Sequence, residues 1–309
     1  MGRSRGGLTT KIHALVDANG LPVMLKLTEG QAHDGRSAAD MLAGLGPGQI
    51  LMADRAYDSD ALRQTMTAQG AWANIKPMPR RVNLPAFSPF LYRYRNLVER
   101  FFNKLKHFRA VATRYEKHAA NYLALVKLAS TRIWLRAYES VSYVGDPFKD
   151  LTRLTDSLRL WVRGKEEAMR DLFWLSDDAW AALEPHLPHK QPGKPRVDDR
   201  RVISGILHIL KTGGRWRDVP PEYGPAKTIY NRYTRWARRG VWQRIFARVA
   251  AAGPIPEELA LDSSNVKAHR SASGGKGGSS AKQSVSRAAA ELPRSIVWPM
   301  VVAGSLRWP

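Results

Sequence analysis

The sequence predicts an α/β fold to which a small all-α domain of helix-turn-helix type is attached. Residues 8–17 and 21–28 are β-rich runs on either side of a turn, which is the pattern of a β-hairpin. Residues 49–54, QILMAD, are a short apolar run typical of a buried central strand. Residues 198–212 and 225–239 have helical periodicity, and a Gly-containing turn joins them.

The composition restricts the partners of the chain. Its 309 residues include 49 Lys and Arg against 27 Asp and Glu, a net charge of +22 that exceeds what solubility requires. Nucleic acid is the partner that such a charge favours. No cysteine is present, which excludes disulfides and thiolate zinc sites. No apolar run is long enough for a membrane span and the N-terminus lacks a signal-peptide pattern, so we expect a cytoplasmic, nucleoid-associated protein with no membrane partner.

Residues 92–106 predict an amphipathic helix with one carboxylate among basic and hydroxyl groups. Tyr92, Arg95, Glu99 and Lys106 are spaced 3, 4 and 7 apart, which places them on one helical face. The opposite side can pack on a core through Leu97, Val98, Phe101, Phe102 and Leu105. A surface helix with incidental charges is the alternative interpretation.

Two further carboxylates follow apolar runs that we interpret as strands. Asp54 ends the run 49–54, and Asp262 ends a second short apolar run within residues 254–269. The alternative for Asp54 is a helix or turn cap. If both aspartates converge with Glu99, the three carboxylates suit a hard cation such as Mg²⁺ or Mn²⁺. We also expect Asp34 to cap a helix over residues 33–45, and residues 58–60 to cap the next one.

The predicted helix 225–239 is basic and carries interleaved aromatic residues. Lys227, Arg232 and Arg235 on this helix are candidates for contacts with DNA phosphates. A small helical bundle with a solvated basic face would give the same periodicity.

Together these motifs resemble the DDE transposases of bacterial insertion sequences. The residues Tyr92, Arg95, Glu99 and Lys106 match the Y-x2-R-x3-E-x6-K signature of that family. LMADRAYDSD resembles its second-aspartate motif, LALDSSNVKAHRSASGGKGG its first-aspartate motif, and GGRWRDVPPEYGPAKTIYNRYTRWARRGVW its helical N-terminal region. The resemblance covers roughly residues 2–138 and 169–283.

The resemblance implies an RNase H-like mixed sheet with flanking helices and a metal-dependent DNA transposase activity. Asp262, Asp54 and Glu99 would bind divalent Mg²⁺ or Mn²⁺ and would be the catalytic residues. Tyr92, Arg95 and Lys106 would position DNA phosphates. The partner would be double-stranded DNA at element ends and targets, nicked by hydrolysis and joined by the freed 3′-hydroxyl. A homo-oligomer in the DNA complex is compatible with the family.

The segments differ from the family in their order. In the family, the helical region and the first aspartate precede the second aspartate and the glutamate, whereas here they follow. We therefore expect permuted halves, with these boundaries: residues 1–139, the C-terminal part of the catalytic domain; 140–168, a linker; 169–253, a helical DNA-binding domain; 254–283, the strand and loop with the first aspartate; 284–309, a disordered tail.

The tail suggests how this order arose. Possible codons for residues 286–304, read from the third base, permit a peptide close to residues 4–20. We hypothesise an out-of-frame translation of a second gene copy. Three other interpretations stay open: a catalytically inactive fusion that only binds element-end DNA, a host RNase H-like nuclease, and a pseudogene product that never folds.

Overall fold

The computed structural model describes residues 1–4, 7–142, 172–188, 197–253 and 255–273. Within these residues one mixed sheet contains β1 (Gly2–Ser4), β2 (Gly7–Asp17), β3 (Pro22–Glu29), β4 (Ile50–Ala53), β5 (Trp72–Ile75), β6 (Thr113–Arg114) and β7 (Glu258–Ala268). The helices near the sheet are α1 (Gly35–Leu42), α2 (Asp60–Ala68), α3 (Pro89–Tyr92), α4 (Asn96–Lys106), α5 (Arg109–Ala112), α6 (Ala119–Ser142) and α13 (Arg270–Ser273). A helical part consists of α9 (Asp177–Leu183), α10 (Asp199–Thr212), α11 (Ala226–Arg238) and α12 (Val241–Ala251).

The sheet is built around β7, although this strand comes last in the described chain. The strand order is β1-β2-β7-β4-β5, with β3 also pairing with β2 and β6 with β7. β7 is antiparallel to β2, from Thr9 opposite Lys267 to Asp17 opposite Leu259. On its other edge it is parallel to β4, and Leu261 pairs with Ala53. Because β7 is hydrogen-bonded on both edges, it joins β2 to β4 and holds the two sides of the sheet together.

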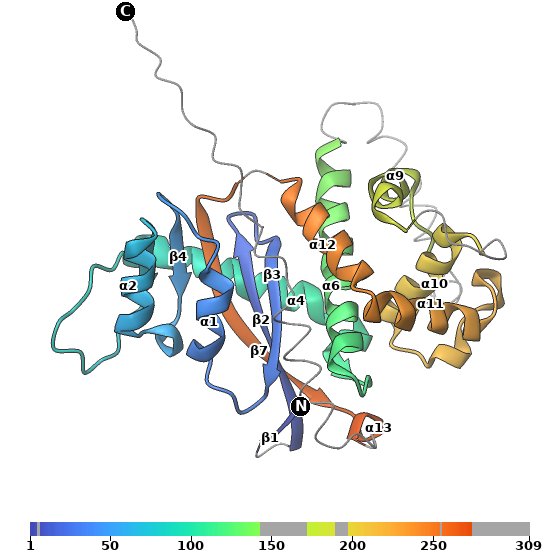
Figure 1. The fold of residues 1–309 in the computed structure, drawn as a ribbon, viewed down its shortest axis with the longest axis horizontal. Coiled ribbons are helices and arrows are strands. Elements are labelled where there is room, and N and C mark those ends of the chain that lie inside the picture. The colour runs from blue at the N-terminus through green and yellow to red at the C-terminus, as the bar shows by residue number, and fades with distance from the viewer. Residues whose placement is uncertain (5–6, 143–171, 189–196, 254, 274–309) are drawn as a thin grey trace, which may run out of the picture.

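Alternate residues of the central strands enter two separate hydrophobic clusters. Ala260 and Val266 of β7 face the cluster that contains α4 and α6, whereas Leu259 and Leu261 face the cluster that contains α1 and α2. This alternation follows from the period of two along a strand. Figure 1 accordingly shows α1 in front of the sheet and α4 passing behind it. The predicted β-hairpin is confirmed, since β2 and β3 pair antiparallel.

The helical part packs against α6, and it shares a hydrophobic cluster with the sheet. Trp236 and Trp242 of the helical part belong to the same cluster as Phe101 of α4 and Trp134 of α6. A polar contact crosses the same boundary: the Tyr138 hydroxyl of α6 donates to the Val249 carbonyl of α12 (3.1 Å). Both parts are therefore joined through one continuous core.

Two expectations from the sequence need correction here. The helix expected at residues 92–106 is interrupted, because residues 93–95 form a 3₁₀ turn between α3 and α4. The strand expected to end at Asp262 continues to Ala268, because β7 goes on pairing with β2 after β4 has ended.

The remaining sequence expectations concern the pair of helices α10 and α11, the linker and the tail. Residues 213–225, which join α10 and α11, contain two 3₁₀ turns, and the helix-turn-helix interpretation stays a prediction. Most of the expected linker, 143–168, and the tail, 284–309, lie outside the described residues. None of the helices in the described ranges is both long and apolar enough to cross a bilayer.

The central position of β7 generates a prediction about truncation. A chain that ends at Gly253 lacks this strand and leaves the edges of β2 and β4 unpaired. Burial of side chains such as Leu259 and Leu261 is worth about 1.5–3 kcal/mol each, against a typical total stability of about 5–15 kcal/mol. We expect this chain to lose cooperative urea unfolding followed by near-UV circular dichroism. A matched chain that ends at Ser273 should keep it, and equal unfolding of the two chains would contradict the role of β7.

Candidate functional site

Two aspartates lie side by side where β4 ends against β7. Ala53 and Leu261 are the last paired residues of the two parallel strands, so Asp54 and Asp262 follow as adjacent positions. Both continue the strand face that carries Met52 and Ala260, which is the face covered by α4. No local sequence pattern could give this adjacency, since the two residues are more than 200 positions apart, and the expectation that they converge came from the resemblance to the family.

The environments of the two aspartates differ. Asp54 also caps a 3₁₀ turn, since its Oδ1 accepts a hydrogen bond from the amide of Ala56 (2.9 Å). Burial raises the pKa of Asp262, and the nearby charge of Asp54 raises it further. The amide of Ser263, which donates to Asp262 Oδ1 (2.7 Å), and the guanidinium of Arg95 act in the opposite direction. The net effect is a raised pKa, so this position favours a positive charge beside it.

Arg95 supplies that charge and links the aspartates to α4. Its Nη1 lies 2.8 Å from Oδ2 of Asp262, and its Nη2 pairs with the carboxylate of Glu99 one helical turn later. The Glu99 side chain is 53% exposed, whereas that of Asp262 is 19% exposed. The guanidinium therefore lies between a partly buried carboxylate and a solvent-facing one.

The other expected site residues surround this arrangement to different degrees. Tyr92 is half-buried, its ring lies 5.7 Å from the Arg95 guanidinium, and burial raises its pKa. Lys106 is exposed at the end of α4, about two turns beyond Glu99. Among the described residues, no group of three or more His, Cys, Asp or Glu side chains is placed to hold a metal ion. The structure brings Asp54, Asp262 and Arg95 together, and it attaches Glu99 through Arg95.

A chain of polar contacts supports Asp262 from the opposite face of the sheet. Ser263 donates its hydroxyl to Asp34 Oδ1 (3.0 Å), and Lys11 Nζ lies 2.8 Å from the same oxygen. Lys11 also donates to the carbonyl of Ala32 (2.8 Å). Because the Ser263 amide holds Asp262, this network fixes the strand at the position of the site. Asp34 was expected to cap a helix, but its side chain makes no cap hydrogen bond and serves this network instead.

His13 lies in the same buried layer. It is fully buried, and its Nε2 is 2.8 Å from the Thr28 hydroxyl and 3.2 Å from the Ser37 hydroxyl. Burial lowers the pKa of His13 to about 4, against a smaller opposing effect of Asp34. The sequence offered one signal for this layer: polar Lys11 and His13 alternate with apolar residues inside a strand.

The three basic residues predicted on α11 have different surroundings. Lys227 and Arg235 are exposed. Arg232 is buried, pairs with Asp199 of α10 and stacks over the ring of Trp236 at 5.2 Å. The structure thus places Arg232 in the core, contrary to the expectation that it faces DNA. The sequence did offer a signal, because Arg232 is three residues after Ile229 and four before Trp236, which places it on the apolar face of the helix.

The buried His13 generates a prediction about acid stability. Its pKa is about 4 in the folded chain, against 6.5 for an ordinary histidine, so the unfolded state gains a proton first as the pH falls. Stability is therefore lost between pH 6.5 and 4, by about 3 kcal/mol for this residue. Urea unfolding at both pH values should show this loss in the wild type and not in His13→Gln. His107→Gln, which removes an exposed histidine, is the control. Equal acid sensitivity of wild type and His13→Gln would contradict the assignment.

Residues 2–134 match the family model "Transposase DDE domain", and residues 175–246 match "Putative transposase of IS4/5 family". The chain is 44% identical over 131 residues to a "Putative transposase for insertion sequence element IS6501" of Brucella ovis, covering 42% of this chain and 100% of that protein.

Other relatives agree with this result. An "Insertion element IS402 uncharacterized 16.2 kDa protein" of Burkholderia cepacia is 38% identical over 107 residues, or 30% of this chain and 73% of that protein. A "Putative transposase for insertion sequence element IS402" from the same organism is 30% identical over 137 residues, or 41% of this chain and 62% of that protein. No solved structure matches. The DDE-domain match over the segment with Asp54 and Glu99, and the full-length match to the Brucella relative, place this chain in the DDE transposase family of insertion sequences.

Proposed function

We propose that the chain cuts DNA at the ends of an insertion sequence and transfers the freed 3′ strand to target DNA, with divalent metal ions as cofactor. The parallel pairing of β4 with β7 carries this proposal, because it sets Asp54 beside Asp262 on the face where α4 brings Glu99. The catalytic residues would be Asp262, Asp54 and Glu99. Neighbouring carboxylates at a strand end repel one another, which destabilises the fold. A reaction that needs a bound cation would explain why the chain carries them.

The donor set fits Mg²⁺ or Mn²⁺ in its chemistry. All three side chains offer carboxylate oxygens, the ligands that hard cations prefer. The raised pKa of Asp262 reflects burial and the charge of Asp54, both of which a bound cation would offset. In the described arrangement the Arg95 guanidinium holds the position between Asp262 and Glu99. Bound metal would supply activation of a water or 3′-hydroxyl and stabilisation of the leaving oxygen.

The residues around the carboxylates would bind and orient DNA. Arg95 and Tyr92 line the same side of the site, and Arg95 would turn from the carboxylates toward a DNA phosphate, which its planar fork suits. Lys106 is exposed two turns along α4 and would contact the backbone further from the cut. Together they would set the register of the strand end against Asp54 and Asp262.

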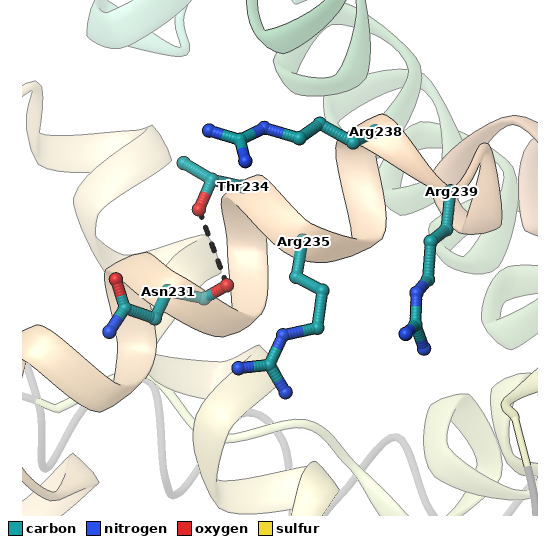
Figure 2. A pocket seen from close by; sticks show the side chains of 5 residues that line it. All are labelled: Asn231, Thr234, Arg235, Arg238 and Arg239. Carbon is teal, nitrogen blue, oxygen red and sulfur yellow. Dashed lines mark hydrogen bonds between the residues drawn. The ribbon is translucent and has the colours of Figure 1, made fainter.

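A second basic surface supports binding of longer DNA. A surface pocket of about 390 Å³ is lined by Asn231, Thr234, Arg235, Arg238 and Arg239 (Figure 2). Arg235, Arg238 and Arg239 are exposed and come from the end of one helix, α11. Such a cluster can accept a phosphate backbone without reading bases. Lys227 lies at the start of the same helix and would extend this contact.

We further propose that the two halves of the catalytic domain occur in permuted order and still form one site. The N-terminal β1 pairs with β2 at Thr9, and Thr9 pairs with Lys267 near the end of β7. The two ends that a permutation would separate thus lie at the same end of the sheet, as Figure 1 shows for the N-terminus and α13. Breaking and rejoining a chain between neighbouring ends preserves the core.

Nicking of a labelled element end in Mg²⁺ tests the proposed reaction. Asp262→Asn, Asp54→Asn and Glu99→Gln should each lower the nicking rate by about 10²- to 10³-fold or more, the usual cost of removing one group that stabilises a developing charge. Asp40→Asn, which removes an exposed carboxylate paired with Lys26, should retain activity. DNA binding by the three inactive variants would exclude misfolding. Wild-type chain that binds the same DNA and never nicks it would instead support the alternative, an inactive permuted fusion.

The α11 pocket predicts a salt-dependent loss of affinity. The double variant Arg235→Ala/Arg238→Ala removes two phosphate contacts, and each contact contributes about 0.9 to the slope of log affinity against log salt. We expect this slope to fall by about 2 in magnitude, measured by fluorescence anisotropy with duplex DNA. Lys26→Ala, which removes a lysine already paired with Asp40, should leave it unchanged. An unaltered slope in the double variant would remove α11 from the DNA surface.

A further inference from the structure

The loop between β5 and α3 presents apolar side chains to solvent from a basic segment. Val82 is 96% exposed and Leu84 is 74% exposed, and Phe90 at the start of α3 is 59% exposed. Residues 76–98 contain five Lys and Arg residues and no Asp or Glu. In Figure 1 this loop projects beyond α2 at the left edge of the molecule. Exposed aliphatic side chains grouped on one loop usually mark a contact surface.

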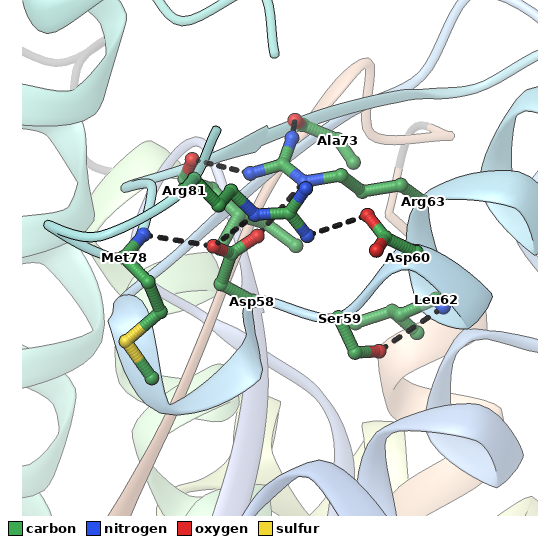
Figure 3. Close-up of polar contacts among 9 residues, drawn as sticks. Asp58, Ser59, Asp60, Leu62, Arg63, Ala73, Met78 and Arg81 are labelled. Atoms are coloured by element: carbon green, nitrogen blue, oxygen red, sulfur yellow. Dashed lines mark hydrogen bonds and ion pairs between the residues drawn. The ribbon is translucent and has the colours of Figure 1, made fainter. Parts of the chain in front are cut away.

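The base of this loop is fixed by a buried carboxylate. Asp58, whose side chain is fully buried, accepts hydrogen bonds from Arg63 Nε (2.9 Å), Arg81 Nε (2.8 Å) and the amide of Met78 (2.8 Å), as Figure 3 shows. Burial alone would raise the pKa of Asp58, but these hydrogen bonds outweigh it and lower the pKa. Residues 58–60 were expected to cap α2, and Ser59 makes that cap. The aspartate holds the loop instead.

The far end of the loop is fixed independently. Asn74 of β5 exchanges two hydrogen bonds with the backbone of Ser88, one donated by its side-chain amide (3.1 Å) and one accepted by its carbonyl oxygen (2.8 Å). The rings of Phe87 and Tyr92 then pack edge to face at 5.3 Å. With both ends tied to buried groups, residues 82–84 project from a preorganised base.

This tip lies close to the candidate site. The loop begins at Lys76, whose amide donates to the carbonyl of Ala53 (3.2 Å), the residue before Asp54. The Lys76 ammonium also lies 5.7 Å from the ring of Tyr92. Val82 is six residues further along, so it lies within about 20 Å of Lys76 even if the chain is fully extended. That span corresponds to about six base steps of duplex DNA.

The charge around the tip selects its partner. The exposed Arg80 is two residues before Val82, the exposed Arg93 lies over the ring of Phe90 beyond the loop, and the whole chain carries +22. A second copy would bring the same positive charge to this surface and be repelled, whereas nucleic acid would neutralise it. Apolar side chains of this kind enter the space between neighbouring base pairs in proteins that kink duplex DNA.

We propose that Val82 and Leu84 form a wedge that unstacks a base step of duplex DNA within about six base pairs of the cleavage position. Arg80 and Arg93 hold the DNA backbone, and Asp58 and Asn74 keep the base of the loop rigid. The proposal rests on the proposed function, because it assumes that DNA lies across Asp54 and Asp262. Because the tip is anchored, the binding of these arginines to DNA can push Val82 and Leu84 between two bases. An unanchored loop would bend away from the DNA instead.

The test uses duplex DNA from the end of the insertion sequence that encodes this chain. 2-Aminopurine, whose fluorescence rises when it is unstacked, replaces one base at a time on both sides of the cleavage position. The wild type, Val82→Ser/Leu84→Ser and Ile255→Ser are compared in Ca²⁺, with affinity followed by anisotropy. Ile255 is a matched control, since it is 54% exposed and lies three residues before β7 begins. All three positions are exposed, so folding should be unaffected.

The wedge predicts enhanced fluorescence at one step in the wild type and in Ile255→Ser, and loss of this enhancement in the double variant while DNA remains bound. Asp58→Asn should reduce the enhancement with Val82 and Leu84 still present. The proposal is overturned if the double variant keeps the enhancement, or if DNA binds and no position responds. A dimer that dissociates in the double variant would assign the tip to self-association and also overturn it. Absence of DNA binding in every variant would refute the proposed function itself.

Discussion

The pairing of β7 with β2 on one edge and β4 on the other is the interaction on which the rest of the structure depends. It aligns Asp262 with Asp54, and it directs alternate residues of one strand into both hydrophobic clusters. The strand follows closely after α12, so the helical part and the sheet cannot be separated without withdrawing the strand that carries Asp262. Backbone pairing thus couples the geometry of the site to the stability of the whole core.

Charge balance then determines how the site is held. Asp262 is partly buried next to another carboxylate, a combination that raises its pKa and opposes ionisation. On the α4 face, the positive charge of Arg95 favours the ionised form of Asp262. On the other face, contacts among Lys11, Asp34 and the Ser263 hydroxyl hold the strand. The two supports differ in kind. The Arg95 guanidinium contacts a carboxylate that faces solvent, whereas the network on the opposite face joins half-buried and buried groups to one another.

Sequence reasoning found local features and missed those that depend on the partner of a strand or helix. The hairpin, the strand before Asp54 and the helix carrying Glu99 follow from periodicity, and the structure contains each of them. The continuation of β7 beyond Asp262 depends on pairing with β2, which no local pattern encodes. Asp34 has the residue type and position of a helix cap, yet its side chain pairs with the distant Lys11. Within the expected cap of residues 58–60, Ser59 makes the cap and Asp58 pairs instead with Arg63 and Arg81. Tertiary contacts outweigh a cap that is worth about 1 kcal/mol.

The same competition explains which positive charges are left to face DNA. A net charge of +22 says nothing about location, and several arginines are committed to buried carboxylates: Arg232 to Asp199, and Arg63 and Arg81 to Asp58. These pairs do structural work, because a buried charge without its partner would cost several kcal/mol. Acidic residues of this basic protein thereby shape its DNA surface indirectly. Because these arginines are paired, the exposed positive charges include those at the end of α11 and Arg80 beside residues 82–84, and under the proposed function these are the charges available to a phosphate backbone.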